Sequence, residues 1–202
     1  MVVTLLRHGL TEPNKRRAYV GASDPPLCLE DKTEIERLRN SLTERTEVFS
    51  SDLTRCLETA KLLFPAHDLI EMPEFREIHF GVWEGKTYED LKEDHDYQSW
   101  LQQPFSQQPP GGESFSIFSE RIEMGWKKLR KEAVSVRNIT VVTHGGVIRY
   151  LLTVLAPEPK QFWEWEVPHA TGYELIWTGK KWRNGERCTL LRAVPTMEKQ
   201  NG

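Results

Sequence analysis

The sequence predicts an α/β fold, a three-layer αβα sandwich in which helices cover both faces of a mostly parallel central sheet. Two short runs of β-branched and apolar residues, 2–6 and 138–143, are typical of buried parallel strands. Strand and helix patterns alternate between these runs, as they do in α/β proteins. The segments 173–176 and 188–194 have the pattern of antiparallel strands, which we expect to close the sheet.

The first long segment with a helical pattern is 30–44. Its apolar residues Ile35, Leu38 and Leu42 recur at intervals of three and four residues, so one face of the helix would be apolar. A short apolar run at 48–50 then predicts the second strand of the chain.

A second helix is predicted over 53–63, because Pro65 stops the helical pattern there. Ser51 or Asp52 is expected to cap its N-terminus, since short polar side chains accept hydrogen bonds from the free backbone amides of a first turn. A short strand is predicted at 69–71, followed by a mixed segment.

Three more helices are predicted further along the chain. The first covers 87–101 and precedes a loop rich in proline and glutamine at 102–112. The next begins at 113–115, and the last covers 146–155. Residues 197–202 are expected to fray.

The length of 202 residues and the apolar content of 38% fit one globular domain over residues 1–202. The 27 basic and 30 acidic residues are mixed along the chain and give a net charge of -3, which argues against a nucleic-acid partner. Neither a signal peptide nor an apolar run of membrane-spanning length is evident, so no membrane partner is expected. The sequence leaves the oligomeric state unknown.

Three cysteines, Cys28, Cys56 and Cys188, have no short spacing between them, so neither a disulfide framework nor a zinc site is predicted. Reduced cysteines are typical of the cytoplasm, which is the expected location. No cluster of carboxylates or histidines has the spacing of metal ligands, and we expect neither a metal nor another cofactor.

Both buried strands end in a His-Gly pair, His8-Gly9 and His144-Gly145. Ligands of parallel sheets bind beyond the carboxyl ends of the strands, so the two histidines are expected to share one site. Hydrolysis of a phosphate monoester would require a nucleophile, cations that neutralise the phosphoryl oxygens and an acid that protonates the leaving group.

Candidates for each of these roles lie near the predicted strand ends. His8 is the candidate nucleophile, and Glu77 is the candidate acid. Arg7 and Arg55 are candidate phosphate ligands, because guanidinium groups hold phosphate oxygens with paired donors. Each residue alone also has a plain structural interpretation, as a surface charge, an ion-pair residue or a core histidine. Their combination favours a site for a phosphate dianion, in which the arginines would lower the pKa of His8 and keep it neutral.

Five segments resemble, in the right order, the motifs of the histidine phosphatase superfamily, in its cofactor-dependent phosphoglycerate mutase-like branch. The first, Arg7–Asn14, is similar to the family pattern RHGxTxxN. The other four are similar to SxLxRAxxTA, ExxxGxxEG, PGGES and the strand before the second histidine, and they cover 51–60, 77–85, 110–114 and 141–146. The resemblance covers about residues 2–155 and implies a phosphoglycerate mutase-like fold.

The resemblance also implies roles for individual residues. His8 would be phosphorylated. Arg7, Arg55 and His144 would bind the phosphoryl oxygens. Glu77 would protonate the leaving group and then activate water.

Three further positions are assigned to the substrate site by the same resemblance. Asn14 matches an asparagine that reaches the phosphate, Thr11 matches a threonine that supports the pocket, and Gly145 belongs to the second-histidine motif. His79 and Glu84 are interpreted as residues that orient the segment that carries Glu77.

The short interval between Glu77 and His144 lacks the insertion that embraces the phosphoglycerate carboxylate in mutases of this branch, so the resemblance favours hydrolysis. Length and layout are most similar to bacterial alpha-ribazole phosphatases of cobalamin assembly, which implies alpha-ribazole 5'-phosphate, a small phosphorylated metabolite, as substrate. Broad-specificity phosphatases are the main alternative, followed by a mutase, a phosphoprotein phosphatase and a non-catalytic phosphate-binding module. Leu10 and Pro13 depart from the common signature and are expected to affect substrate choice.

The densest aromatic cluster, Trp163 to Trp165, is interpreted as core packing in preference to a substrate pocket. Trp83 and Trp100 are expected in the pocket wall. Three histidines are interpreted as surface or structural residues: His67, His95 and His169. The segment 169–172 is left open as a lining of the pocket mouth.

Overall fold

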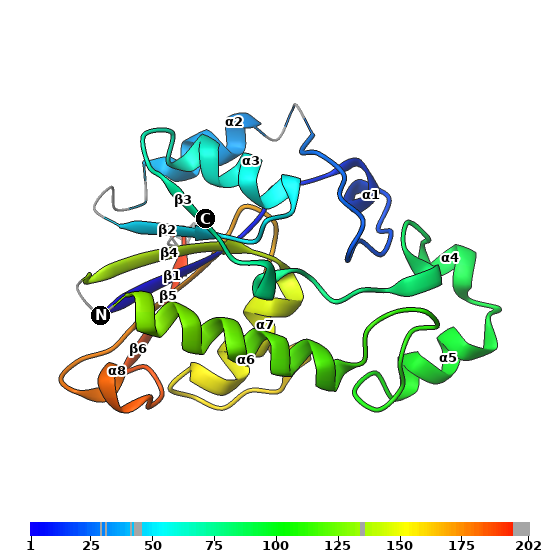
Figure 1. Cartoon of the computed structure of the whole chain (residues 1–202). Coiled ribbons are helices and arrows are strands. Elements are labelled where there is room, and N and C mark those ends of the chain that lie inside the picture. The colour runs from blue at the N-terminus through cyan, green and yellow to red at the C-terminus, as the bar shows by residue number, and fades with distance from the viewer. Residues whose placement is uncertain (29, 31, 41, 43–45, 134–135, 196–202) are drawn as a thin grey trace, which may run out of the picture.

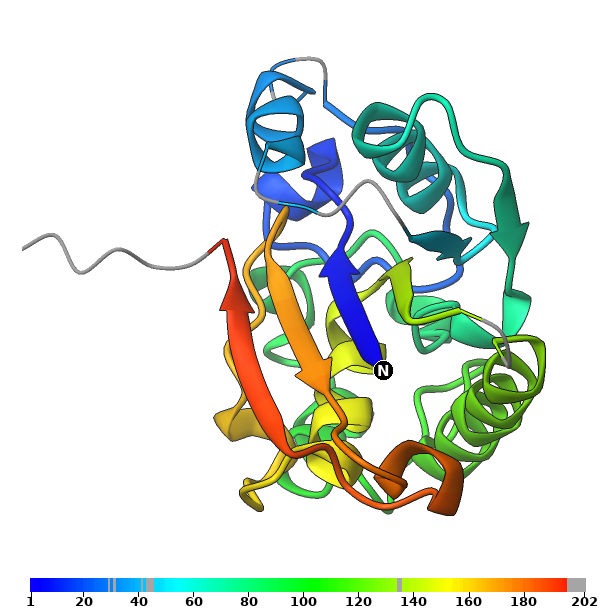
Figure 2. The ribbon, with the colours of Figure 1, turned by 90° about the vertical axis from the view of Figure 1, so that its left-hand side faces the viewer.

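The computed structural model describes residues 1–28, 30, 32–40, 42, 46–133 and 136–195. Its centre is a six-stranded sheet with the order β3-β2-β4-β1-β5-β6 (Figures 1 and 2). β5 is antiparallel to both of its neighbours and the other pairs are parallel, which confirms the predicted mostly parallel sheet. The strands are β1 (Val2–Arg7), β2 (Glu47–Ser50), β3 (Leu69–Glu71), β4 (Asn138–Thr143), β5 (Gly172–Ile176) and β6 (Leu190–Val194).

Helices cover both faces of the sheet, as Figure 1 shows, so the predicted three-layer sandwich is confirmed. Successive residues of a strand point to opposite faces. Leu5 of β1 accordingly belongs to one apolar cluster with residues of α6 (Phe115–Glu132) and α7 (Gly145–Leu155). Leu6 belongs to a second cluster with residues of α2 (Lys32–Arg39) and α3 (Thr54–Leu63).

The central pair of strands sets the position of the site. β1 and β4 run parallel, and their last residues, Arg7 and Thr143, are partners in the register. Because the two strands end at the same level, the residues that follow them, His8 and His144, leave the sheet side by side. The remaining short elements are α1 (Glu12–Lys15), η2 (Pro73–Phe75), η3 (Gly81–Trp83), α4 (Tyr88–Leu91), α5 (His95–Gln102), η4 (Phe162–Glu164) and α8 (Lys181–Asn184).

Two predicted helices differ from the structure in extent. α2 is shorter than the predicted 30–44, because the backbone turns back at Asn40 and Leu42, whose amides bond to carbonyls only three residues earlier. The predicted last residues 43–44 lie outside the described part of the chain. The predicted helix 87–101 is two helices, α4 and α5, since the side chain of Asp94 accepts from the amide of Tyr97 and starts a new helix.

The predicted cap of α3 is wrong. Leu53 occupies the N-cap position, and neither Ser51 nor Asp52 fills it. The first amide of the helix, that of Thr54, instead donates to the carboxylate of Asp24 over 2.7 Å. A side chain from a different loop therefore supplies the acceptor that the local sequence was expected to supply.

The described ranges contain no helix that is both long and apolar enough to cross a membrane. The predicted fraying of 197–202 concerns residues outside those ranges.

Candidate active site

The candidate site lies at the carboxyl ends of β1, β2 and β4 (Figure 1). His8 follows β1 directly, and His144 follows β4 directly. Both side chains are buried, and their rings meet edge to face with centroids 5.1 Å apart. The structure brings the two histidines together, as their places in the sequence predict.

A neighbouring carbonyl group fixes the ring of His8. Nδ1 lies 2.6 Å from the carbonyl oxygen of Gly9, which only accepts, so Nδ1–H is the donor. Burial, together with the charges of Arg55 and Arg7, holds the pKa of His8 well below its usual range. The neutral ring therefore keeps its lone pair on Nε2.

The guanidinium of Arg7 is anchored through one of its nitrogens. Nη1 donates to the carbonyl oxygen of Val167 over 2.6 Å, whereas the buried Nε has no partner among the described residues. A Cβ at position 145 would stand 3.2 Å from Cζ of Arg7, so Gly145 lets the guanidinium approach the backbone closely. Burial lowers the pKa of Arg7 to about 10, and the group remains a cation at neutral pH.

Arg55 lies in the first turn of α3 and is fully buried. Its Nη1 donates to the carbonyl oxygen of Ser23 over 2.7 Å, and its Nη2 donates to that of Gly21 over 2.8 Å. The buried Nε has no partner among the described residues, and the carboxylate of Asp24 stands 3.9 Å from Nη1. Two neutral carbonyl groups thus hold the Nη atoms of this cation, and the carboxylate of Asp24 forms a long ion pair with Nη1.

The loop that holds Arg55 is itself held by Glu84. The carboxylate accepts the backbone N–H groups of residues 21–23 at 2.9 to 3.2 Å and that of Phe80 at 3.0 Å. Burial alone would raise the pKa of Glu84, but the hydrogen bonds from the Ser23 side chain and these amides outweigh it and lower the pKa. Glu84 therefore contacts the segment that carries Glu77, as expected, and also holds the loop whose carbonyl groups accept from Arg55.

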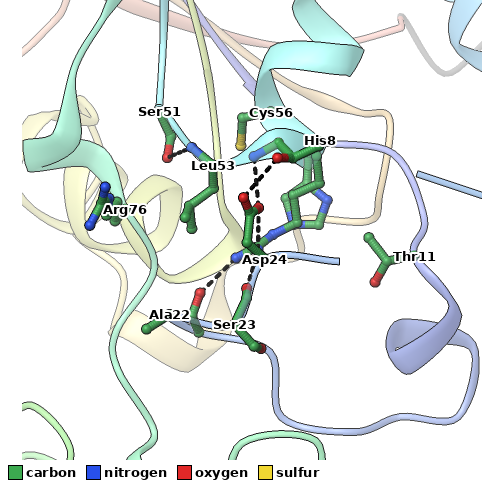
Figure 3. A network of polar contacts seen from close by, with 12 residues as sticks. His8, Thr11, Ala22, Ser23, Asp24, Ser51, Leu53, Cys56 and Arg76 are labelled. Atoms are coloured by element: carbon green, nitrogen blue, oxygen red, sulfur yellow. Dashed lines mark hydrogen bonds and ion pairs between the residues drawn. The ribbon is translucent and has the colours of Figure 1, made fainter. Parts of the chain in front are cut away.

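His144 is held by Ser51, which follows β2, and by Cys56 of α3, both of which are drawn in the polar network of Figure 3. Its Nε2 lies 2.9 Å from Oγ of Ser51 and 3.4 Å from Sγ of Cys56. Burial, followed by the charge of Arg55, holds the pKa of His144 well below its usual range, so this ring is neutral as well. Burial also raises the pKa of the Cys56 thiol, which therefore stays protonated.

Glu77 lies between η2 and η3, next to the start of α7. Its Oε2 accepts the backbone N–H of Gly146 over 2.8 Å, and its Oε1 accepts that of Ile78 over 3.0 Å. A Cβ at position 146 would stand 2.3 Å from Oε1, so only glycine leaves room for the carboxylate in this place. Gly146, which belongs to the second-histidine motif, thereby holds the carboxylate of Glu77, the candidate acid.

Thr11 and Asn14 form the start of α1. The backbone N–H of Thr11 and its hydroxyl both donate to Oδ1 of Asn14, at 3.3 and 2.8 Å. Thr11 is buried. The amide oxygen of Asn14 is engaged in this cap, so the NH₂ group is the part of its side chain that is left to donate to a ligand.

A cavity of about 420 Å³ adjoins the site on the side of Glu77. Arg149 and Glu77 are its ionisable lining residues, apart from a tyrosine. The Nε of Arg149 donates to the carbonyl oxygen of Trp165 over 3.0 Å, and its guanidinium lies 5.9 Å from the centre of the Trp163 ring. Most of the wall is aromatic: Tyr19, Phe80, Trp100, Phe105, Phe115, Phe118, Phe162 and Trp163.

The tryptophan assignments are right in two places and wrong in two. Trp100 lines the cavity and Trp165 is buried, as predicted. Trp163 is 57% exposed and lines the cavity instead of the core. Trp83 is fully buried in a small aromatic cluster with Tyr97 and Trp100, and it does not reach the cavity. Aromatic content alone does not indicate which ring faces a void.

Two further residues lie at the site, and neither is among the predicted catalytic or substrate-binding residues. His169 packs edge to face against His8, with ring centroids 5.4 Å apart; it was interpreted as a surface or structural residue, with 169–172 left open as a lining of the pocket mouth. Arg149 belongs to none of the motifs. Its position five residues after His144, on the helix that starts at the site, was the available signal.

One group in the described ranges has the composition of a metal site. Ligand atoms of Glu12, Cys28 and Glu30 lie within 4.8 Å of one another. The ammonium group of Lys15 already bonds to Glu12 over 3.0 Å and to Glu30 over 3.3 Å, so a cation already neutralises these carboxylates.

Comparison with known proteins adds independent evidence. A profile of the histidine phosphatase superfamily, branch 1, matches residues 3–187. The adenosylcobalamin/alpha-ribazole phosphatase of Salmonella typhimurium is 32% identical over 177 residues, which are 83% of this chain and 86% of that protein.

Solved structures are similar over most of their length. The alpha-ribazole phosphatase of Shigella flexneri has a TM-score of 0.81 at 29% identity and covers 89% of this chain and 92% of its own. A phosphoglycerate mutase of Thermus thermophilus has a TM-score of 0.70 at 34% identity, over 95% of this chain and 98% of its own. With its phosphoglycerate mutase-like fold and the profile match over most of its length, the chain belongs to the histidine phosphatase superfamily, branch 1, and is an enzyme of the phosphatase class.

Proposed function

We propose that the chain hydrolyses phosphate monoesters of small metabolites through a phosphohistidine on His8. One observation carries this proposal: a neutral, buried histidine has a free Nε2 lone pair beside two arginines. The buried Nε atoms of Arg7 and Arg55 have no partner among the described residues. Buried donors are rarely left unbonded, so a bound phosphoryl group is the natural acceptor for them.

In the first half of the reaction, Nε2 of His8 attacks phosphorus while the ester P–O bond breaks. Glu77 gives its proton to the departing oxygen, as a general acid. Arg7 and Arg55 neutralise the phosphoryl oxygens, and neutral His144 donates a hydrogen bond to them. The products of this half are the free alcohol and phosphohistidine.

In the second half, water attacks phosphorus and the N–P bond breaks. Glu77, now ionised, takes the proton from the attacking water. Inorganic phosphate leaves, and His8 returns to its neutral form with the Nδ1–H bond to Gly9 intact. No metal takes part in this scheme, because the arginines supply the positive charge that a metal would supply.

We further propose alpha-ribazole 5'-phosphate as the substrate, with a broad-specificity phosphatase as the alternative. The aromatic cavity beside Glu77 supports this choice, since the leaving group must depart on the side of the acid and a planar base would fill an aromatic pocket. The names of the relatives from Salmonella typhimurium and Shigella flexneri point to the same substrate. The three cysteines are free, in keeping with the cytoplasm as the location.

The chemistry is tested by replacing the nucleophile. His8→Ala should abolish turnover of p-nitrophenyl phosphate, and the wild-type protein quenched during turnover should carry acid-labile, base-stable phosphate on His8. The matched control is His95→Ala, because His95 is exposed and does not line the cavity. Full activity of His8→Ala would refute the proposed intermediate.

The substrate is tested by comparing kcat/KM for alpha-ribazole phosphate, 3-phosphoglycerate and simple sugar phosphates. We expect a clear preference for alpha-ribazole phosphate. Trp163→Leu in the cavity wall should reduce that preference, whereas Tyr88→Leu, an exposed aromatic residue that does not line the cavity, should leave it unchanged. A flat profile would favour the broad-specificity alternative.

A further inference from the structure

His169 lies on a turn that is tied to the backbone of the nucleophile. The hydroxyl of Thr171 donates to the carbonyl oxygen of Pro168 over 2.9 Å and closes the turn. The amide of Ala170 donates to the carbonyl oxygen of His8 over 3.3 Å, and the amide of Arg7 donates to that of Thr171 over 2.8 Å. The place of His169 relative to His8 is therefore set by main-chain bonds between the turn and the end of β1.

This turn holds a strained residue next to His169. Ala170 has a φ of +52°, in the left-handed region that alanine rarely adopts. Such a conformation costs about 1 kcal/mol or more for a residue with a Cβ. Strain of this kind persists where the surrounding structure requires a particular side-chain position, and it is concentrated at functional sites. Here the position that it fixes is that of the His169 side chain.

The ring of His169 has an unused nitrogen inside the site. Its Nε2 is buried and has no hydrogen-bond partner among the described residues. Burial, followed by the charges of Arg7 and Arg55, lowers the pKa of His169 to about 3, so the ring is neutral and carries one N–H. Three unpartnered nitrogens thus lie on residues whose charges or ring act on His8: Arg7, Arg55 and His169.

We propose that His169 is a further phosphoryl ligand, which donates an N–H hydrogen bond from Nε2 to a phosphoryl oxygen. One acceptor with several oxygens would satisfy all three unpartnered nitrogens at once, and a phosphoryl group has such oxygens. This hydrogen bond would form to the phosphoryl group of the substrate and would remain in the phosphohistidine. The covalent bonds that form and break are therefore the same as in the proposed reaction. This inference rests on the proposed function of His8.

The competing explanation is that the ring of His169 only packs against His8 and orients it. The two explanations differ in what a replacement must preserve. His169→Phe keeps an aromatic ring against His8 and removes the N–H, whereas His169→Gln removes the ring and keeps an amide N–H of comparable reach.

The experiment measures inhibition by orthovanadate, which has the geometry of the transferred phosphoryl group, together with kcat and KM for p-nitrophenyl phosphate. Loss of one hydrogen bond to a charged group weakens binding by about tenfold to a hundredfold. We expect His169→Phe to weaken vanadate inhibition and reduce kcat/KM by that factor, and His169→Gln to restore most of both. Thermal unfolding of both variants checks that each is folded.

A His169→Phe variant with wild-type vanadate inhibition would overturn the donor role. So would equal losses in the Phe and Gln variants, because that result assigns the ring a packing role. The proposed function would fail separately, through the absence of phosphohistidine on His8 in the wild-type protein. The two failures are therefore distinguishable.

Discussion

Replacing Gly146 with alanine should displace the Glu77 carboxylate without unfolding the protein. A Cβ at position 146 would stand 2.3 Å from Oε1 and 3.1 Å from Cδ of Glu77, whereas an ordinary contact begins at 3.4 Å. The carboxylate must therefore move by about 1 Å, because Gly146 is part of helix α7 and the side chain of Glu77 is more flexible than the helix backbone. Alanine favours a helix over glycine by about 1 kcal/mol, so α7 should remain formed.

A misplacement of about 1 Å at a reacting group reduces the rate by about a hundredfold. The loss should depend on the leaving group, because protonation by Glu77 matters for a basic alkoxide and matters little for p-nitrophenolate. We expect Gly146→Ala to reduce kcat for alkyl phosphates by about a hundredfold and for p-nitrophenyl phosphate by less than about tenfold.

Steady-state kinetics with both substrates, on single and double variants, measure whether the effect passes through Glu77. In Glu77→Gln the acid is already absent, so adding Gly146→Ala should cause little further loss. Unchanged alkyl phosphatase activity in Gly146→Ala, or full additivity in the double variant, would refute the reasoning from the 2.3 Å approach.

Three other outcomes are expected. His8, His144 and His169 have lowered folded-state pKa values, so only the unfolded chain takes up protons on them as the pH falls through about 6.5. The free energy of unfolding should then decrease as the pH falls, by at most about 1.4 kcal/mol per pH unit for each histidine, and for His169 the decrease should continue down to a pH of about 3. A free energy of unfolding, measured by urea denaturation, that stays constant between about pH 7 and pH 5 would contradict this. Glu84→Gln should raise KM several-fold with a smaller change in kcat, because it loosens the loop that holds Arg55, the candidate phosphate ligand, and an unchanged KM would speak against that role. Asp24→Ala should lower the melting temperature through loss of about 1 kcal/mol of helix capping, as measured by calorimetry, and an unaltered melting temperature would show that another acceptor replaces it.

The sheet and the meeting of its two histidines were predictable, because they depend on local patterns. A run of β-branched residues identifies β1 and β4 without reference to any other part of the chain. The rule that ligands bind at the carboxyl ends of parallel strands then places His8 and His144 together. The motif resemblance identified Arg55 and Glu77 for a similar reason, since each belongs to a short motif that is continuous in the sequence.

The features that were missed depend on contacts between distant segments. The acceptor for the first amide of α3 comes from Asp24, in a separate loop earlier in the chain, and no local pattern indicates it. The chain breaks into α4 and α5 because Thr87 and Asp94 each cap a separate helix. The spacing of apolar residues does not indicate where the second helix begins. His169 follows no motif, and only the backbone bonds of its turn to β1 bring its ring to the nucleophile.

The polar groups around His8 and the walls of the neighbouring cavity place different demands on a substrate. A buried donor without a partner costs about 1 to 3 kcal/mol. Among the described residues, such nitrogens occur on Arg7, Arg55 and His169, whose charges or ring act on His8, and on the indoles of Trp83, Trp100 and Trp165. The first three belong to the candidate site, where a bound phosphoryl group would accept from them. The cavity beside Glu77 makes a smaller polar demand, because most of its wall is aromatic and the indole Nε1 of Trp100 is its one lining donor that is buried without a partner among the described residues. We therefore expect the arginines and His169 to select a phosphoryl group, and the cavity walls to select the alcohol by shape and by an acceptor for this indole.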